Sequence, residues 1–266
     1  MLTRDDLARV ARRHGLGLGR TEHEYVILCL LDGLAQASLL AQSLVFKGGT
    51  ALRQVYFPDW RHSEDLDFSA LPGLGSERLA DAIAEWFAVV QRKWGITISI
   101  RRLHRADGAA RLRAQFVGPL AFPNLLLMDF TLDEPVILPP VRRPVVTTLF
   151  DAPRPVVQTY ALEELLAEKL RSILQRAKSR DYYDVWRLLA EKATFFDRSL
   201  AREVLLAKCR HKGLTFSGPD DFLVPARLAE AQTYWERDLQ EQVADLPEFS
   251  VMVASLRRLL GDFLAR

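Results

Sequence analysis

Two aspartates separated by one residue, Asp65 and Asp67, are the side chains whose spacing points most directly to chemistry. Polar and apolar residues alternate over residues 63–69, which predicts a strand with both aspartates on one face. Two carboxylates on one face repel each other unless a cation lies between them, and oxygen ligands at this spacing suit Mg²⁺. A solvated pair with a purely structural role is the alternative.

A third carboxylate, Asp129, lies in the apolar segment 124–132, which is also predicted to be a strand. A buried and unpaired aspartate there would cost several kcal/mol. If the two predicted strands are neighbours, Asp129 joins the first two aspartates, binds metal with them and helps to deprotonate an attacking hydroxyl group. A lone aspartate that is hydrogen-bonded at a strand end is the alternative.

The segment Lys47-Gly48-Gly49-Thr50 follows a short apolar run at residues 43–47 and precedes the first two aspartates. Its glycines allow close approach of the backbone to a ligand, and the helix predicted after them, with Thr50 as N-cap, offers N–H groups to a phosphate. A plain strand-to-helix turn is the alternative. The spacing matches neither a P-loop nor a dinucleotide-binding motif, which disfavours kinases and dehydrogenases of those classes.

Lys169 falls in the apolar stripe of a helix predicted over residues 162–176. An ammonium group in that position calls for an anion, and a triphosphate bound in a cleft between two domains would provide it. The alternatives are a lysine that reaches past the helix edge to solvent and an ion pair with Asp181 or Asp184. Those two aspartates share one face of the next predicted helix and would orient Lys169 or Arg180.

The net charge is only +2, but the basic residues are clustered. Residues 92–113 contain seven lysines and arginines and a single acidic residue, Asp107, and residues 169–180 contain five basic residues and no acidic one. Such segments indicate either a solvated face or a surface that binds a polyanion.

The elements that must position these residues divide the chain into two predicted domains. Residues 1–155 form an α/β domain with helices near residues 4–13, 21–40, 50–56 and 76–93 and with strands near residues 43–47, 63–69, 96–103, 111–117 and 124–132. Residues 133–155 include six prolines, Pro153 among them, and are expected to be an irregular connection. Residues 156–266 predict a domain of helices alone, near 162–176, 181–190, 200–209, 226–243 and 247–264.

The composition, 49% hydrophobic and 26% charged, is that of a folded globular protein. No apolar run approaches the roughly 20 residues of a membrane span, and the N-terminus lacks an apolar signal segment, so a cytoplasmic location is expected. Two cysteines in apolar helical segments predict buried free thiols.

Four motifs in order resemble the AbiEii/AbiGii toxin family of DNA polymerase β-like nucleotidyltransferases. They are KGGTAL at residues 47–52, RHSEDLDF at 61–68, EKL at 168–170 and RDYYD at 180–184. The resemblance extends from about residue 45 to residue 188. It implies a bilobed α/β (α+β) protein with an N-terminal nucleotidyltransferase core, built on a mixed sheet, and a C-terminal helical domain.

The resemblance also implies site residues. The nucleotide-binding residues would be Lys47, Gly48, Gly49, Thr50, Ser63 and Lys169. Asp65 and Asp67 would bind Mg²⁺ or Mn²⁺, with Asp129 as a further metal ligand. Catalytic roles would fall on Asp65, Asp67, Lys169 and one of Asp181 and Asp184, of which Asp181 is favoured because it follows Arg180 directly. The basic clusters would bind RNA through Arg101, Arg102, Arg105, Arg176, Lys178 and Arg180.

The implied reaction is transfer of nucleotides from a nucleoside triphosphate to an RNA acceptor, the tRNA 3′ end above all, which blocks translation. The implied partner is a cognate antitoxin, often with a winged-helix domain. The alternatives are the same reaction on a protein or a small molecule, and an inactive module that binds nucleotides or RNA. The substitutions Asp65→Ala and Lys169→Ala are expected to abolish transfer and to leave the fold intact.

Overall fold

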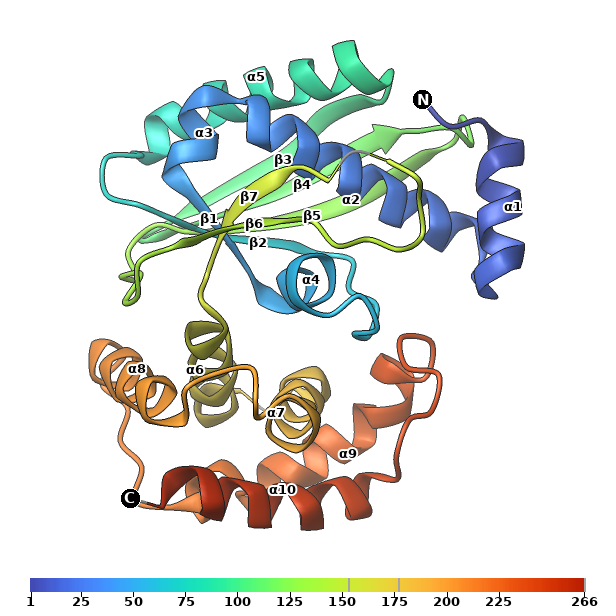
Figure 1. Cartoon of the computed structure of the whole chain (residues 1–266). Helices are drawn as coiled ribbons and strands as arrows, with labels where there is room; N and C mark the ends of the chain where they lie inside the picture. Colours follow the sequence, from blue (N-terminus) through green and yellow to red (C-terminus); the bar gives the residue numbers. More distant parts are fainter. Residues whose placement is uncertain (153, 177, 266) are drawn as a thin grey trace. The chain divides into compact units, whose positions relative to one another are not determined.

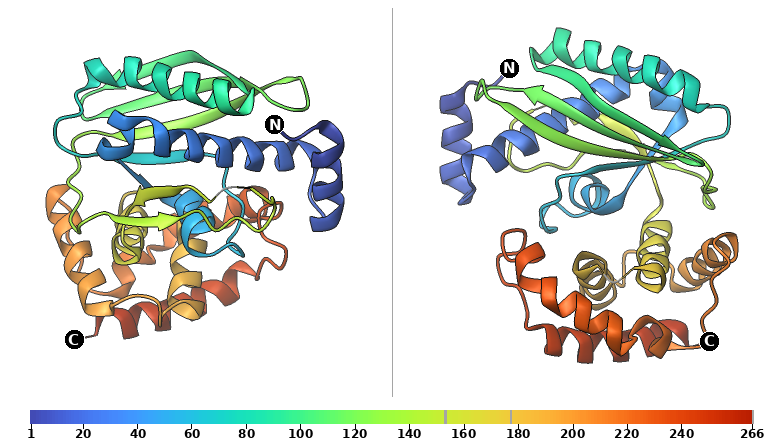
Figure 2. Two further views of the ribbon diagram at one scale, coloured as in Figure 1. Left: turned by 45° about the horizontal axis from the view of Figure 1, so that its top comes forward. Right: turned by 180° about the vertical axis from the view of Figure 1, so that it is seen from behind.

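The structure, a computed structural model, describes residues 1–152, 154–176 and 178–265, apart from the side chain of Ser76. The chain forms two compact units. The first consists of Met1–Val136 and Pro140–Thr159, and the second of Ile137–Pro139 and Tyr160–Arg266. Figures 1 and 2 show that a mixed sheet with helices makes up the first unit and that helices make up the second. The predicted α/β fold class is therefore confirmed.

A seven-stranded mixed sheet, in the order β3-β4-β5-β2-β1-β7-β6, forms the centre of the first unit (Figure 1). β2 pairs with β5 and β1 with β7 in parallel, and the other neighbours are antiparallel. The strands are β1 (Leu44–Lys47), β2 (Leu66–Ala70), β3 (Thr97–Ala106), β4 (Ala109–Val117), β5 (Pro123–Thr131), β6 (Val141–Pro144) and β7 (Val156–Thr159).

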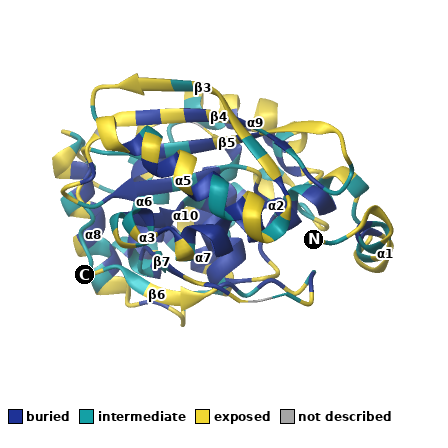
Figure 3. Cartoon of the chain, turned by 90° about the horizontal axis from the view of Figure 1, so that it is seen from above, coloured by how far each residue is buried: buried dark blue, intermediate teal, exposed yellow. Residues whose placement is uncertain are grey.

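Helices α2, α3 and α5 lie on one face of this sheet (Figure 1), whereas on the other face, here called the open face, every second residue in the first part of β4 is exposed. The resulting alternation of buried and exposed positions along β4 is visible in Figure 3. The helices of this unit are α1 (Arg4–His14), α2 (Leu18–Gln36), α3 (Ser38–Ser43), α4 (Gly48–Ala51), the π-helix η1 (Leu52–Tyr56) and α5 (Ser76–Trp94). Across the described residues, no helix of either unit is both long and apolar enough to cross a membrane.

The core under these helices is built around Phe68 of β2. Its ring stacks on Phe130 of β5 with centroids 5.6 Å apart, and Phe46 of β1 lies 5.4 Å away on the other side. Trp86 of α5 meets Phe68 edge-on at 5.9 Å and donates a hydrogen bond to the carbonyl of Leu30. Three neighbouring strands are thus locked to the helical layer at one position.

The second unit is helical, with a buried ion pair at its centre. Its helices are α6 (Leu162–Gln175), α7 (Ser179–Glu191), α8 (Arg198–His211), the 3-10 helix η2 (Pro219–Phe222), α9 (Pro225–Leu239) and α10 (Phe249–Leu264). Glu164 of α6 lies 3.0 Å from Lys208 of α8, with both side chains fully buried. The same carboxylate accepts hydrogen bonds from the backbone N–H groups of Ile137 and Leu138, which attaches this short segment to α6.

Two strands were not predicted. The sequence indicates an irregular connection over residues 133–155 and only helices beyond it, but β6 and β7 pair with each other and β7 pairs with β1. The first unit therefore continues to Thr159. Strands of four residues are too short to show alternation, and Pro144 fits because it closes an edge strand, where a missing N–H is tolerated. Pro153 lies outside the described residues.

The two cysteines, Cys29 in α2 and Cys209 in α8, are buried free thiols, as predicted. Burial raises the pKa of the Cys29 thiol to about 12 and also raises the pKa of Cys209. Because the thiolate is the reactive form, we expect neither cysteine to react with iodoacetamide at about pH 8 in the native protein, and both to react in guanidinium chloride. Mass spectrometry counts the labels. Rapid labelling of the native protein would contradict the burial.

Candidate active site

The parallel pairing of β2 with β5 brings three aspartates to one face of the sheet. Asp67 and Asp129 are directly opposite each other in this pairing, and Asp65 precedes the first residue of β2. Leu66 and Phe68 are fully buried on the other face, so Asp65 and Asp67 occupy the half-exposed face, as their alternation predicts. The strands on which the sequence places the three carboxylates are therefore neighbours.

The paired glycines make room for functional groups. Gly48 has a φ of +79°, and a Cβ atom there would lie 2.1 Å from Oδ2 of Asp67, so that carboxylate packs directly against the glycine. A Cβ atom on Gly49 would lie 2.8 Å from Nη2 of Arg61 and 3.1 Å from Oγ of Ser63. Side chains at these two positions would displace one carboxylate, one guanidinium and one hydroxyl group.

The residues on either side of the glycines are also buried. Lys47 occupies the N-cap position of α4, lies opposite Asp67 in the β1–β2 pairing and donates a hydrogen bond of 3.1 Å to Oγ1 of Thr131. The sequence predicts Thr50 as the N-cap, and this is wrong. Thr50 lies within α4, and its hydroxyl donates to the backbone carbonyl of Asp65, which links the helix to the start of β2.

A buried carboxylate in α2, Glu24, holds the loop that leads into β2. It accepts hydrogen bonds from Nε of Arg53 at 2.9 Å and from Nε2 of Gln54 at 2.7 Å, and it lies 2.6 Å from Nδ1 of His62. Burial acts to raise the pKa of Glu24, but His62 and Arg53 outweigh burial and hold that pKa below its usual value. Glu24 is not among the residues predicted from the sequence, although its position directly before the apolar run YVILCLL is a signal that could have identified it.

The donor set fits a divalent cation only in part. Asp129 forms an ion pair with Arg111, whose Nε lies 2.7 Å from Oδ1. Within the described part of the chain, no three His, Cys, Asp or Glu side chains are arranged to hold a metal ion. Asp65 and Asp67 nevertheless fit Mg²⁺, which proteins commonly hold with one or two carboxylates together with substrate phosphates.

A third ligand from Asp129 requires that carboxylate to leave Arg111. The side chains of Arg111 and Asp129 are 69% and 40% exposed, and an ion pair this exposed contributes only about 0–1 kcal/mol. Asp129, with weaker contributions from Asp65 and Asp67, raises the pKa of Arg111, which places Arg111 within the field of all three carboxylates. The exchange of Asp129 between a cation and Arg111 is therefore energetically accessible.

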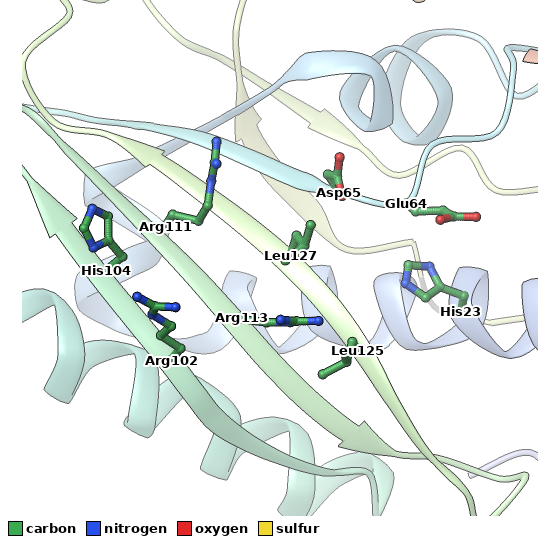
Figure 4. Close-up of a pocket in the computed structure, with 9 residues that line it drawn as sticks. All are labelled: His23, Glu64, Asp65, Arg102, His104, Arg111, Arg113, Leu125 and Leu127. Carbon is green, nitrogen blue, oxygen red and sulfur yellow. The ribbon is translucent and has the colours of Figure 1, made fainter. Parts of the chain in front are cut away.

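A hollow of about 570 Å³ lies on the open face of the sheet next to Asp65 (Figure 4). Burial lowers the pKa of His23 below its usual value, although the nearby carboxylates of Glu64 and Glu24 act to raise it. Two leucines on β5, Leu125 and Leu127, are 40% and 41% exposed in the hollow. The lining residues are His23, Glu64, Asp65, Arg102, His104, Arg111, Arg113, Leu125 and Leu127.

Most of these lining residues are absent from the site predicted by sequence. Four of them belong to none of the sequence motifs, namely His23, His104, Leu125 and Leu127. The sequence identifies Arg111 and Arg113 only as members of a basic cluster. The alternation along residues 111–117 is the signal that would have placed both arginines on one face, because β4 presents every second residue to the helices.

A β-bulge determines which of the basic residues of β3 lie on the open face of the sheet. The register shifts between Ile100 and Arg102, which makes Arg101 the extra residue. After the bulge, Arg102 pairs with Arg113 on the open face, whereas Arg105 pairs with Ala110, whose side chain is buried under the helices. Arg102 and Arg105, which the sequence assigns to one RNA-binding set, therefore lie on opposite faces.

In the second unit, Lys169 forms ion pairs with both candidate aspartates. Its Nζ lies 2.9 Å from Oδ1 of Asp181 and 2.9 Å from Oδ2 of Asp184, and only 12% of the lysine side chain is exposed. Burial acts to raise the pKa of Asp181, but Lys169 and then Arg176 hold that pKa below its usual value. Of the alternatives left open by the sequence, the ion pair is the one observed.

The basic residues predicted to bind RNA from the second unit have acidic neighbours. Arg176 lies 3.0 Å from Oδ2 of Asp181. Lys178 and Arg180 line a separate hollow of about 530 Å³ together with Glu230 and Asp238 of α9. The positive charge of residues 169–180, a segment without acidic residues, is thus partly neutralised by acidic side chains from other segments.

Comparisons with known proteins find a matching family model and a similar solved structure. A family model described as "Nucleotidyl transferase AbiEii toxin, Type IV TA system" matches residues 29–261. Among solved structures, MenT4, a nucleotidyltransferase toxin from Mycobacterium tuberculosis H37Rv, is similar to this chain with a TM-score of 0.73. The two share 21% sequence identity, and the match covers 100% of this chain and 91% of MenT4, which supports a common fold. No curated protein sequence matches the chain.

The pairing of Lys169 leads us to expect that Lys169→Ala destabilises the fold, which differs from the expectation drawn from the sequence. Removal of the ammonium group leaves the buried carboxylates of Asp181 and Asp184 beside each other without it, so we expect a loss of about 3–5 kcal/mol in the free energy of unfolding. Urea denaturation measures the loss. The exposed lysine of the same unit, Lys178, is the control, and Lys178→Ala should change stability by less than about 0.5 kcal/mol. Equal midpoints for the two variants would show that the pairing is not structural.

Gly48→Ala should destabilise the protein, because the new Cβ atom would collide with the Asp67 carboxylate and the left-handed backbone alone costs roughly 1–2 kcal/mol. Gly19→Ala is the matched control, since Gly19 lies in α2 with open space around it and alanine favours helices. Thermal unfolding should show a lower midpoint for the first variant and an equal or higher midpoint for the second. A Gly48→Ala protein as stable as the wild type would mean that Asp67 does not depend on this glycine.

Proposed function

Because this chain belongs to the family of nucleotidyl transferase AbiEii toxins of type IV toxin–antitoxin systems, we propose that it transfers nucleotides to RNA, at the 3′ end of tRNA. Family membership establishes the enzyme class, and with it a nucleoside triphosphate as substrate, a divalent metal ion and a cognate antitoxin. The proposal adds Mg²⁺ as the metal, tRNA as the acceptor, a winged-helix antitoxin and action in the cytoplasm, where tRNA is found.

The observation that supports an RNA acceptor is the basic hollow beside Asp65. Arg102, Arg111 and Arg113 line it together with Asp65 on the open face of the sheet, and Arg111 lies within the field of all three aspartates. Three guanidinium groups around one hollow attract a polyanion, whereas a neutral small acceptor would gain little from them. The hollow therefore favours RNA over the small-molecule alternative.

The proposed reaction is attack of an RNA 3′-hydroxyl on the α-phosphate of the nucleotide. The new bond joins that oxygen to the α-phosphorus, the bond from this phosphorus to the bridging oxygen breaks, and pyrophosphate leaves. Asp65 and Asp67 would hold a metal ion, which would neutralise charge on the phosphates. Asp129, once it no longer binds Arg111, accepts the hydroxyl proton.

The nucleotide phosphates are proposed to lie along the Gly-Gly turn. Gly48 and Gly49 leave space there, and the Ser63 hydroxyl and the Arg61 guanidinium both lie against Gly49. Arg61 thus joins the residues that the sequence motif assigns to nucleotide binding. Lys47 and Thr50 position the turn through their contacts with Thr131 and with the Asp65 carbonyl.

In the second unit, the phosphate-binding role that the sequence motif assigns to Lys169 stays a prediction. Its two aspartate partners, Asp181 and Asp184, are then positioning residues, since they fix the ammonium group through hydrogen-bonded ion pairs.

Purified protein incubated with total tRNA, Mg²⁺ and each labelled nucleoside triphosphate in turn tests the proposal. We expect label on tRNA with the wild type and a loss of at least about 100-fold with Asp65→Asn, because this change removes a carboxylate charge without removing volume. Asp262→Asn on the exposed surface of α10 is the matched control and should retain full activity.

Three other results are informative. Label on protein instead of RNA would assign the reaction to a protein acceptor. Nucleotide binding without any labelled product would indicate an inactive binding module. Equal labelling by the wild type and by Asp65→Asn would remove Asp65 from the catalytic site, provided that both variants unfold at the same temperature.

A further inference from the structure

Two hollows follow each other along the open face of the sheet. The first, of about 570 Å³, begins at Asp65, and the second, of about 530 Å³, reaches Pro123 and Asn124 at the start of β5. Arg102, Arg113 and Leu125 line both hollows, so the two are continuous. From Asp129 to Asn124 the strand advances five residues, or roughly 17 Å at about 3.4 Å per residue.

This continuous surface, which we call the acceptor track, has a definite composition. Its floor is apolar, with Leu125 and Leu127 about two-fifths exposed, and arginines surround the floor. The track is defined by Arg101, Arg102, Arg111, Arg113, Leu125 and Leu127.

The combination of an apolar floor with cationic edges discriminates between forms of RNA. A duplex presents phosphates and sugars, while its base faces are stacked inside, so a duplex would use the arginines and leave the leucines without a partner. Unpaired nucleotides present phosphates and apolar base faces together. The track therefore matches a single strand longer than one nucleotide, and not the side of a helix.

One end of the acceptor track lies at the candidate catalytic aspartates, where the reacting end of such a strand would have to be. Its first hollow contains Asp65, and Arg111 within that hollow is bound to Asp129. An ion pair this exposed contributes little, so a phosphate of the strand can replace the carboxylate on Arg111. Occupation of the track would thereby release Asp129 at the moment when an acceptor is present.

We propose that the acceptor track binds the unpaired 3′-terminal nucleotides of the RNA acceptor, with Arg102 and Arg113 on phosphates and Leu125 and Leu127 against base faces. The proposal rests on the proposed function, and it names the part of the acceptor that the enzyme recognises. Arg105 is excluded from the track, because the bulge in β3 places it on the opposite face.

The test compares two RNA hairpins of the same stem, one with four unpaired 3′ nucleotides and one with a blunt end. Binding is measured by fluorescence anisotropy over a range of salt concentrations and without nucleoside triphosphate, so that binding is separated from transfer. We expect the wild type to bind the hairpin with the unpaired end at least about tenfold more tightly.

Matched variants locate the contacts. Arg102→Ala should weaken binding of the unpaired end roughly three- to tenfold and lower the slope of log Kd against log salt by about 0.7, the value for one phosphate contact with a single strand. Arg105→Ala, on the same strand but on the other face, should change neither quantity. Leu127→Ser should remove most of the preference for the unpaired end with an unchanged salt slope, and Leu206→Ser, an exposed leucine of α8, should not.

All of these side chains are exposed, so the variants are expected to fold, and circular dichroism checks this. Arg113→Ala replaces Arg102→Ala if the latter does not fold. Two results would overturn the proposal: equal affinity of the wild type for both hairpins, or equal effects of the Arg102 and Arg105 substitutions. If tRNA is still labelled in the transfer assay, the proposed function is unaffected by either result. Binding of neither hairpin, with no RNA labelled, would overturn both and would turn attention to an acidic protein segment as occupant.

Discussion

The parallel pairing of β2 with β5 is the constraint on which the rest of the first unit depends. It sets Asp67 opposite Asp129, and it is held in place because Phe68 and Phe130 stack on the face away from these carboxylates. A shift of one residue in this pairing would put a carboxylate into the aromatic core and a phenylalanine onto the open face. The hydrophobic contacts under the sheet therefore determine the geometry of the charged groups above it.

One buried carboxylate in each unit is matched by cationic partners and fixes a segment that has no regular structure of its own. Glu24 binds the loop between η1 and β2 through Arg53 and His62. Glu164 binds Lys208 and a piece of the connecting segment. Such networks contribute less through net attraction than through the large cost of leaving any member unpaired, so they specify one arrangement of the chain.

Features determined by local periodicity could be predicted from the sequence, and those determined by contacts between distant residues could not. The alternation around Asp65 and Asp67 and the apolar run before Asp129 predicted their strands, and four short motifs pointed to the family. No local signal reports the bulge at Arg101, which reverses the faces of the arginines that follow it. β6 and β7 depend on pairing, and the partners of Lys169 and Glu24 depend on how the helices pack.

The short segment Ile137–Pro139 belongs to the second unit although the chain on both sides of it belongs to the first. The polypeptide thus passes from one unit to the other three times, and its two stretches in the second unit meet at the Glu164 carboxylate. No single cut yields both units whole: a fragment that starts at Tyr160 would lose two of the hydrogen bonds that satisfy a buried glutamate. Genetic exchange of the helical part between relatives must therefore carry this tripeptide with it, or supply another donor to Glu164.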